Sequence, residues 1–222
     1  MSPRKAGRED VAAAKRAVYG SVDIDMVAGP SEVLVLADGT ADARFAAADL
    51  LGQAEHDRLA SAILVTTSER LAWETARELE RRLETLERRK IAAEAIGSYG
   101  AAIVCRDMDE AVAIANDIAP EHLEIMTAEP RALLPRIRNA GAVFLGAYTP
   151  EPLGDYFAGP SHVLPTSGSA RFFSPIGVDS FIKRMSVIEY TKEALSEEAE
   201  DITAIAYAEK LTAHAHAVEV RA

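Results

Sequence analysis

The stretch Glu32-Val-Leu-Val-Leu36 is an apolar, β-branched run, and it predicts a strand buried on both faces of a sheet. Similar short runs lie further along the chain, at residues 62–66, 101–105, 123–126 and 142–145. Between these runs, apolar positions recur at helical spacing over residues 42–56, 68–90, 108–118 and 130–139, with Asp42 and Ser68 as expected N-caps.

This alternation of strands and helices predicts the fold class α/β, with a Rossmann-like, mostly parallel sheet flanked by helices. Helices are also expected at 179–184 and 193–218, which form a small C-terminal helical unit. Residues 1–10 lack apolar periodicity and should be poorly ordered unless docked. We predict three parts: an N-terminal linker helix over 1–20, the Rossmann-like domain over 21–175 and the helical unit over 176–222.

The composition excludes several classes of partner. With 24 basic and 35 acidic residues, the chain of 222 residues carries a net charge of −11, which repels nucleic acid and anionic lipid. It contains no apolar stretch of membrane-spanning length and no secretory leader, so the cytoplasm is the expected compartment. The single cysteine, Cys105, lies in an apolar run and is expected to be a buried thiol.

Potential metal ligands are scattered along the sequence. Gln53 and His56 are three residues apart at the end of a predicted helix, although a histidine there is more often a surface residue. Asp155 and His162 lie in the Gly/Pro-rich segment 150–175, which has no helical period, and His214 lies near the C-terminus. Carboxylate, amide and imidazole groups suit a divalent cation, but their spacing alone does not demand one.

A possible acid/base pair, Glu121 and His122, stands at a junction of helix and strand. Such junctions can lie at the ligand-binding edge of a parallel sheet, but spacing alone favours a polar helix stop at Pro120-Glu-His122. No Gly-x-Gly-x-x-Gly or Gly-x-x-x-x-Gly-Lys-Ser/Thr motif is present, so no recognised phosphate-binding loop is found. The nearest candidate, Ala28-Gly-Pro-Ser-Glu32, is first of all a structural turn.

Several motifs in order resemble those of the histidinol dehydrogenase family, and the similarity runs from about residue 11 to about residue 221. They are Ala28-Gly-Pro-Ser-Glu32, Gln53-Ala-Glu-His56, Pro120-Glu-His-Leu123, Gly154-Asp-Tyr156, His162-Val-Leu-Pro-Thr166, Ser186-Val-Ile-Glu-Tyr190 and Leu211-Thr-Ala-His214. The resemblance implies a zinc- and NAD-dependent oxidation of L-histidinol through L-histidinal to L-histidine, the last step of histidine biosynthesis. The partner is then the small molecule L-histidinol, within a homodimer that has shared active sites.

The resemblance also implies roles for individual residues. Glu121 and His122 match the catalytic pair, in which His122 takes protons from the alcohol and the hydrate while Glu121 activates water. The zinc ligands are expected to be Gln53, His56, Asp155 and His214. The substrate-binding residues are expected to be these four ligands together with Ser31, His122 and Glu209. No NAD-binding residues are assigned.

The chain departs from the family pattern in its length, since family members are about twice as long. Their front half supplies part of this sheet and a nucleotide-binding domain, and Arg8 stands where they carry an Asn that touches NAD. We therefore expect an incomplete sheet and a truncated form with impaired activity. Two alternatives stay open: a non-redox zinc- or imidazole-binding module, and a metal-assisted hydrolase that uses Glu121 and His122.

Overall fold

The computed structural model describes residues 8–222, which form two compact units that are treated separately here. The first unit extends to Phe181, and the second comprises Ile182–Ala222. In the first unit a five-stranded sheet has the strand order β3-β2-β1-β4-β5, and every pair of neighbouring strands is parallel. The strands are β1 (Glu32–Ala37), β2 (Ser61–Thr66), β3 (Gly100–Val104), β4 (His122–Met126) and β5 (Ala142–Leu145). The predicted α/β class is confirmed.

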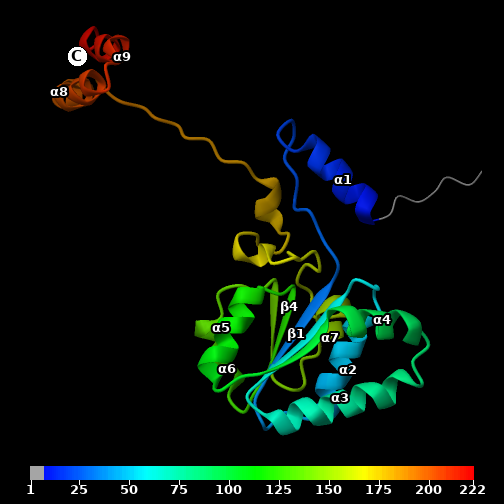
Figure 1. Cartoon of the computed structure of the whole chain (residues 1–222). Helices are drawn as coiled ribbons and strands as arrows, with labels where there is room; N and C mark the ends of the chain where they lie inside the picture. Colours follow the sequence, from blue (N-terminus) through cyan, green and yellow to red (C-terminus); the bar gives the residue numbers. More distant parts are fainter. Residues whose placement is uncertain (1–7) are drawn as a thin grey trace, which may run out of the picture. The chain divides into compact units, whose positions relative to one another are not determined.

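Helices cover both faces of this sheet (Figure 1). Along β1, Val33, Val35 and Ala37 pack on one face with α2 (Ala43–Ala54), α3 (Glu69–Leu83) and α4 (Arg89–Tyr99). Leu34 and Leu36 pack on the other face with α5 (Met108–Ile118). Because both sides of β1 are buried, the strand is apolar at successive positions instead of alternating.

Two predicted N-caps are confirmed. The Asp42 side chain accepts a hydrogen bond from the Arg44 amide at the start of α2, and the Ser68 side chain accepts one from the Leu71 amide in α3. These bonds satisfy amides that the first turn of a helix leaves without an intrahelical partner. The expectation of a buried Cys105 is also confirmed, since its exposed fraction is 5%.

Several predicted helices are wrong in extent. The single helix expected over 68–90 ends at Leu83, and a second helix, α4, follows from Arg89. The helix expected over 130–139 is only α6 (Pro130–Leu133) with the 3-10 turn η1 (Leu134–Arg136), because Pro135 cannot continue an α-helix. The helix expected over 179–184 is the 3-10 turn η3 (Val178–Phe181).

Two segments whose sequences show no helical periodicity nevertheless contain helix. Helix α1 (Arg8–Val18) begins inside the segment 1–10, whose first seven residues lie outside the described part of the chain. The Gly/Pro-rich segment 150–175 contains α7 (Glu151–Tyr156) and the 3-10 turn η2 (Ser169–Arg171). Pro150 precedes α7, and Pro152 lies in its first turn, where proline removes no helical hydrogen bond.

The second unit is a helical hairpin. Its helices are α8 (Lys192–Ala208) and α9 (Thr212–Glu219), so the continuous helix expected over 193–218 is broken. Lys210 adopts a φ of 62°, the left-handed conformation that reverses the chain between the two helices. Ile205, Tyr207 and Leu211 leave large apolar surfaces exposed within this unit.

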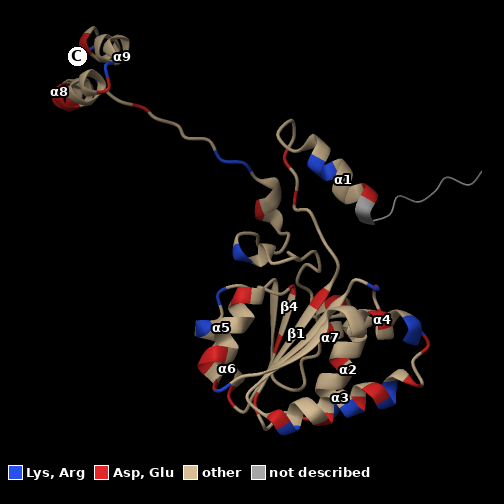
Figure 2. Cartoon of the chain, in the orientation of Figure 1, with Lys and Arg blue, Asp and Glu red and all other residues tan. Residues whose placement is uncertain are grey.

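Strand β3 forms one edge of the sheet, and its surroundings are apolar. Val104 is half exposed, and Trp73, which lines the same surface pocket, exposes 67% of its surface. Elsewhere acidic and basic residues alternate along the surface of α3, so charge is spread over most of this helix (Figure 2). Within residues 8–222, every helix is too short or too polar to span a bilayer.

Candidate functional site

His122 is the first residue of β4 and is almost fully buried. Its Nδ1 lies 2.9 Å from the backbone oxygen of Glu32, and since a carbonyl oxygen only accepts, Nδ1 is the protonated nitrogen. Nε2 is buried without a hydrogen-bond partner and lies 3.7 Å from Glu151 Oε1. Burial lowers the pKa of His122, so a neutral imidazole with a free Nε2 is favoured. This is the form that a general base requires.

Glu121 is held beside this histidine by the neighbouring strand. Its Oε2 accepts a hydrogen bond from the Glu32 amide at 2.9 Å and lies 3.6 Å from His122 Nδ1. The Glu32 carboxylate in turn accepts the amides of Ser167 and Glu121, at 3.0 and 3.4 Å. The β1–β4 pairing, in which Val33 lies opposite His122, thereby joins the two acidic residues at the amino ends of the strands.

Asp155 and His162 face His122 from the Gly/Pro-rich segment. Asp155, on α7, is nearly buried and forms an ion pair with His162 Nδ1, while His162 stays half exposed. The His122 and His162 rings are stacked with their centroids 6.1 Å apart. All three side chains line a cavity of about 190 Å³ that is also bounded by Phe144 and Leu164.

A group of carboxyl side chains is buried next to this cavity. Burial raises the pKa of Glu151, and its Asp155 neighbour raises it further. Burial likewise raises the pKa of Glu124, as does the adjacent Asp49 carboxyl. Glu124 Oε1 accepts the Glu151 amide at 2.8 Å. These shifts favour protonated carboxyl groups, which explains how so many acidic side chains share one interior.

The predicted ligands of the first helix lie at the end of α2. Gln53 is 1% exposed, and its Oε1 has no hydrogen-bond partner, whereas His56 follows the helix and is exposed. His56 is near enough to His122 to lower the pKa of that imidazole. A buried amide oxygen without a partner is unusual in a native protein, and a bound cation would supply one.

Ser31 lies directly before β1, in the turn 28–32. The Gly29 amide donates to Thr166 Oγ1, and a Cβ at Gly29 would collide with Ser167 Oγ. The turn is thus packed against the segment that follows His162, which agrees with its structural interpretation. Glu209 and His214 lie in the second unit, at the end of α8 and in α9, and both are exposed. Their part in the site stays a prediction.

Among residues 8–222, the one group of His, Cys, Asp and Glu side chains close enough to share a cation is His122, Asp155 and His162, whose ligand atoms lie within 4.8 Å of one another. This group has only Asp155 in common with the predicted zinc ligands. Imidazole nitrogen, carboxylate oxygen and the unpartnered Gln53 oxygen are all donors that Zn²⁺ accepts. The donor set of the first unit therefore fits zinc.

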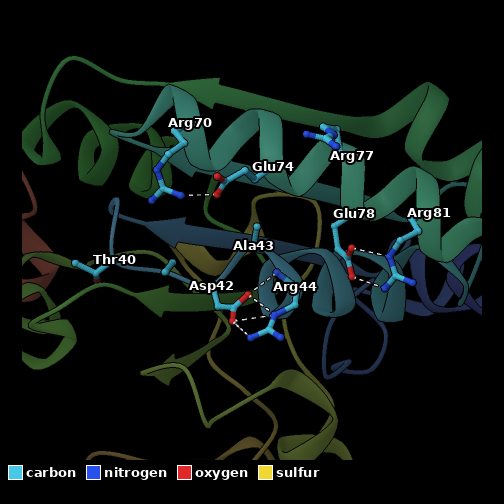
Figure 3. Close-up of a pocket in the computed structure, with 10 residues that line it drawn as sticks. Thr40, Asp42, Ala43, Arg44, Arg70, Glu74, Arg77, Glu78 and Arg81 are labelled. Atoms are coloured by element: carbon cyan, nitrogen blue, oxygen red, sulfur yellow. Dashed lines mark hydrogen bonds and ion pairs between the residues drawn. The ribbon is translucent and has the colours of Figure 1, made fainter.

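A larger cavity, about 740 Å³, lies elsewhere, between the start of α2 and the surface of α3 (Figure 3). Three of its four arginines are neutralised by carboxylates, in the pairs Arg44–Asp42, Arg70–Glu74 and Arg81–Glu78. Such pairs are typical of a solvated helix surface. The smaller cavity beside His122 has the convergent acid, base and ligand groups that the larger one lacks.

Comparison with known proteins identifies the family. Residues 6–222 match the family model described as histidinol dehydrogenase. The chain belongs to the histidinol dehydrogenase family. It is 58% identical over 211 residues to the histidinol dehydrogenase of Halalkalibacterium halodurans and 60% identical over 211 residues to that of Caldanaerobacter subterraneus subsp. tengcongensis. Each match covers 95% of this chain.

The solved histidinol dehydrogenase of Elizabethkingia anophelis has the same fold, with a TM-score of 0.90 and 42% identity over 97% of this chain. The chain covers 50% of that structure, and 50% and 49% of the two relatives above. It thus spans about half the length of the histidinol dehydrogenases that it matches.

Sequence reasoning assigned no role to Glu151 and Glu124, which the structure brings to the site, and it named His162 only as a potential metal ligand. His162 was visible as a histidine seven residues after Asp155 in the same loop. Glu151 was hidden because its segment showed no helical period, and α7 carries it to His122. Glu124 lies within a strand, where an acidic residue alone gives no signal of burial.

Proposed function

We propose that this chain supplies the zinc-binding, substrate-binding and acid/base residues of an NAD-dependent L-histidinol dehydrogenase, which oxidises its substrate through L-histidinal to L-histidine. The observation that carries the proposal is His122, whose Nδ1 is fixed by the Glu32 carbonyl and whose Nε2 is buried without a partner. The family membership adds the substrate class.

His122 Nε2 would take the proton of the substrate hydroxyl in the first oxidation and of the hydrate hydroxyl in the second. The Nδ1–H bond to Glu32 keeps the ring oriented, so the same nitrogen is presented in both steps. Glu121, held by the Glu32 amide, would take a proton from the water that adds to the aldehyde. The aldehyde must be hydrated first because a bare aldehyde cannot lose hydride to give an acid.

We propose Gln53, His56, Asp155 and His214 as zinc ligands that also line the substrate site, with Ser31 and Glu209 as further substrate contacts. When bound, the ion would act as a Lewis acid that fixes the substrate amine and imidazole. Since His214 and Glu209 belong to the second unit, a homodimer with shared sites is part of the proposal.

The cofactor NAD does not fit the described residues, since residues 8–222 contain no recognised phosphate-binding turn and Arg8 replaces the expected Asn. A polypeptide of these 222 residues should therefore bind zinc and histidinol better than it turns substrate over. The same observation favours, as a second candidate, a non-redox module that binds zinc and imidazole compounds.

The test is titration calorimetry with L-histidinol, with and without zinc, beside an assay that follows NADH absorbance. Zinc-dependent binding of histidinol that the Gln53→Ala variant weakens supports the proposal. If the chain turns histidinol over at a high rate and His122→Ala abolishes this activity, these 222 residues are sufficient for NAD-dependent oxidation. Absence of any zinc-dependent binding would contradict the proposal, and ester hydrolysis without NAD would favour a hydrolase.

A further inference from the structure

Helix α7 is short and has no N-cap of its own. It spans six residues, Glu151–Tyr156, and the preceding Pro150 offers no side-chain hydrogen bond to its first turn. Pro152 contributes no amide. The Glu151 amide would therefore be a buried donor without a partner if nothing outside the helix reached it. Asp155 is on this helix, so whatever fixes α7 also fixes Asp155.

The missing cap comes from the sheet. Glu124 Oε1, on β4, accepts the Glu151 amide at 2.8 Å. Glu124 is two residues after His122, and since side chains two apart in a strand project from the same face, both point to the side of the sheet that α7 occupies. At 1% exposure, Glu124 is as inaccessible as any apolar core residue.

Glu124 also faces the helix that carries another predicted ligand. Its carboxyl group neighbours Asp49 of α2, and Asp49 lies one helical turn before Gln53. The buried Glu124 side chain thus belongs to β4 and contacts both α7 and α2. These three elements carry His122, Asp155 and Gln53, respectively.

We propose that Glu124 is a positioning residue, which caps α7 from the sheet and thereby holds Asp155 at its distance from His122 and from the end of α2. The inference rests on the proposed function in so far as Asp155 and Gln53 are taken as zinc ligands. Glu124 itself touches neither substrate nor metal in this account. What matters is the reach of its acceptor oxygen to the Glu151 amide.

Two substitutions distinguish the length of the Glu124 side chain from its ionisable carboxyl group. Glu124→Gln keeps the length and an acceptor oxygen but removes the ionisable group. Glu124→Asp keeps the carboxyl group but withdraws it by one methylene from the Glu151 amide. Zinc affinity is measured by competition with a chromophoric chelator, and folding by thermal melting. We expect Glu124→Asp to bind zinc about 10- to 100-fold more weakly, as for other residues that orient a metal ligand. Glu124→Gln should stay close to the unsubstituted chain.

Met126→Ala is the matched control, because Met126 is buried on the same face of β4, two residues further along. It should melt earlier but keep its zinc affinity. The proposal is overturned if Glu124→Asp keeps full affinity, if Glu124→Gln loses it, or if Met126→Ala loses as much as Glu124→Asp. If the unsubstituted chain fails to bind zinc, the proposed zinc function is contradicted instead, so the two failures are distinguishable.

Discussion

At the scale of single residues, the site is defined by hydrogen bonds that leave one atom of a side chain free. His122 is the clearest example, since the Glu32 carbonyl fixes Nδ1 and leaves the buried Nε2 without a hydrogen-bond partner. A sequence cannot show this, because Glu32 and His122 are 90 residues apart and meet only through the pairing of β1 with β4. The residue types at the site were predictable, whereas their protonation was not.

The assignment of His122 as base or ligand can be decided by two alanine variants. If zinc is held by Gln53, His56, Asp155 and His214, Asp155→Ala should abolish zinc binding and His122→Ala should leave it nearly unchanged. If zinc is held by the group His122, Asp155 and His162, both variants should lose the metal. Equilibrium dialysis of zinc followed by elemental analysis distinguishes these results, and His162→Ala, retaining or losing zinc, gives an independent check.

The buried carboxyl groups predict how stability depends on pH. Burial and the Asp49 carboxyl raise the pKa of Glu124 above its ordinary value of 4.5, so the folded state holds this proton more tightly than the unfolded chain does. The stabilisation is complete below pH 4.5 and is lost as the pH rises through the folded-state pKa. We expect the free energy of unfolding to fall over this range in urea titrations. Glu124→Gln should flatten that dependence, and an equally steep slope in the variant would contradict the assignment.

At the scale of elements, the strands were predicted to within one residue at every end. The signal is strongest at β1, an apolar run bounded by turn residues and buried on both faces. The helices were less predictable where charged residues continue a helical pattern past its end, as at 84–88 and 209–211. Helix α7 was not predicted, because Pro150, Pro152 and Gly154 are residues typical of a loop. Proline is nevertheless well suited to the first turn of a helix.

Gly154 of α7 lies against the ring of Phe144 on β5. A Cβ there would lie 2.7 Å from Phe144 Cε1 and 2.8 Å from its Cζ, so the ring or the helix must move. We expect Gly154→Ala to lower the free energy of unfolding by about 1–3 kcal/mol, the usual cost of overpacking a core. Because Asp155 is the next residue, zinc affinity should fall as well.

The matched control for this substitution is Gly97→Ala. Gly97 is a helical glycine of α4 with no atom within 4 Å of an added Cβ. It should stabilise the chain by about 0.5–1 kcal/mol, because alanine loses less backbone entropy in a helix. Urea titrations of both variants measure the two effects, and a Gly154→Ala variant as stable as the unsubstituted chain would show that Phe144 moves aside freely.

At the scale of the whole molecule, association is the main expectation. Helices α8 and α9 leave Ile205 64% exposed and Leu211 42% exposed within their own unit. Apolar surface of this kind commonly marks an interface between subunits. We expect light scattering at micromolar concentration to give the mass of a dimer. A strictly monomeric particle would count against shared sites, and Ile205→Glu should shift a dimer toward monomer.

The exposed edge strand β3 affects the tendency of the protein to aggregate at high concentration. An edge strand with exposed apolar side chains on it and beside it, here Val104 and Trp73, is a surface on which further strands can pair. We therefore expect fibrils to grow when the protein is warmed. A dye that fluoresces on binding cross-β structure measures their growth. A charged side chain on an edge strand opposes the pairing of further strands, so Val104→Lys should lengthen the lag time of fibril growth. An unchanged lag time would show that fibrils do not grow from β3.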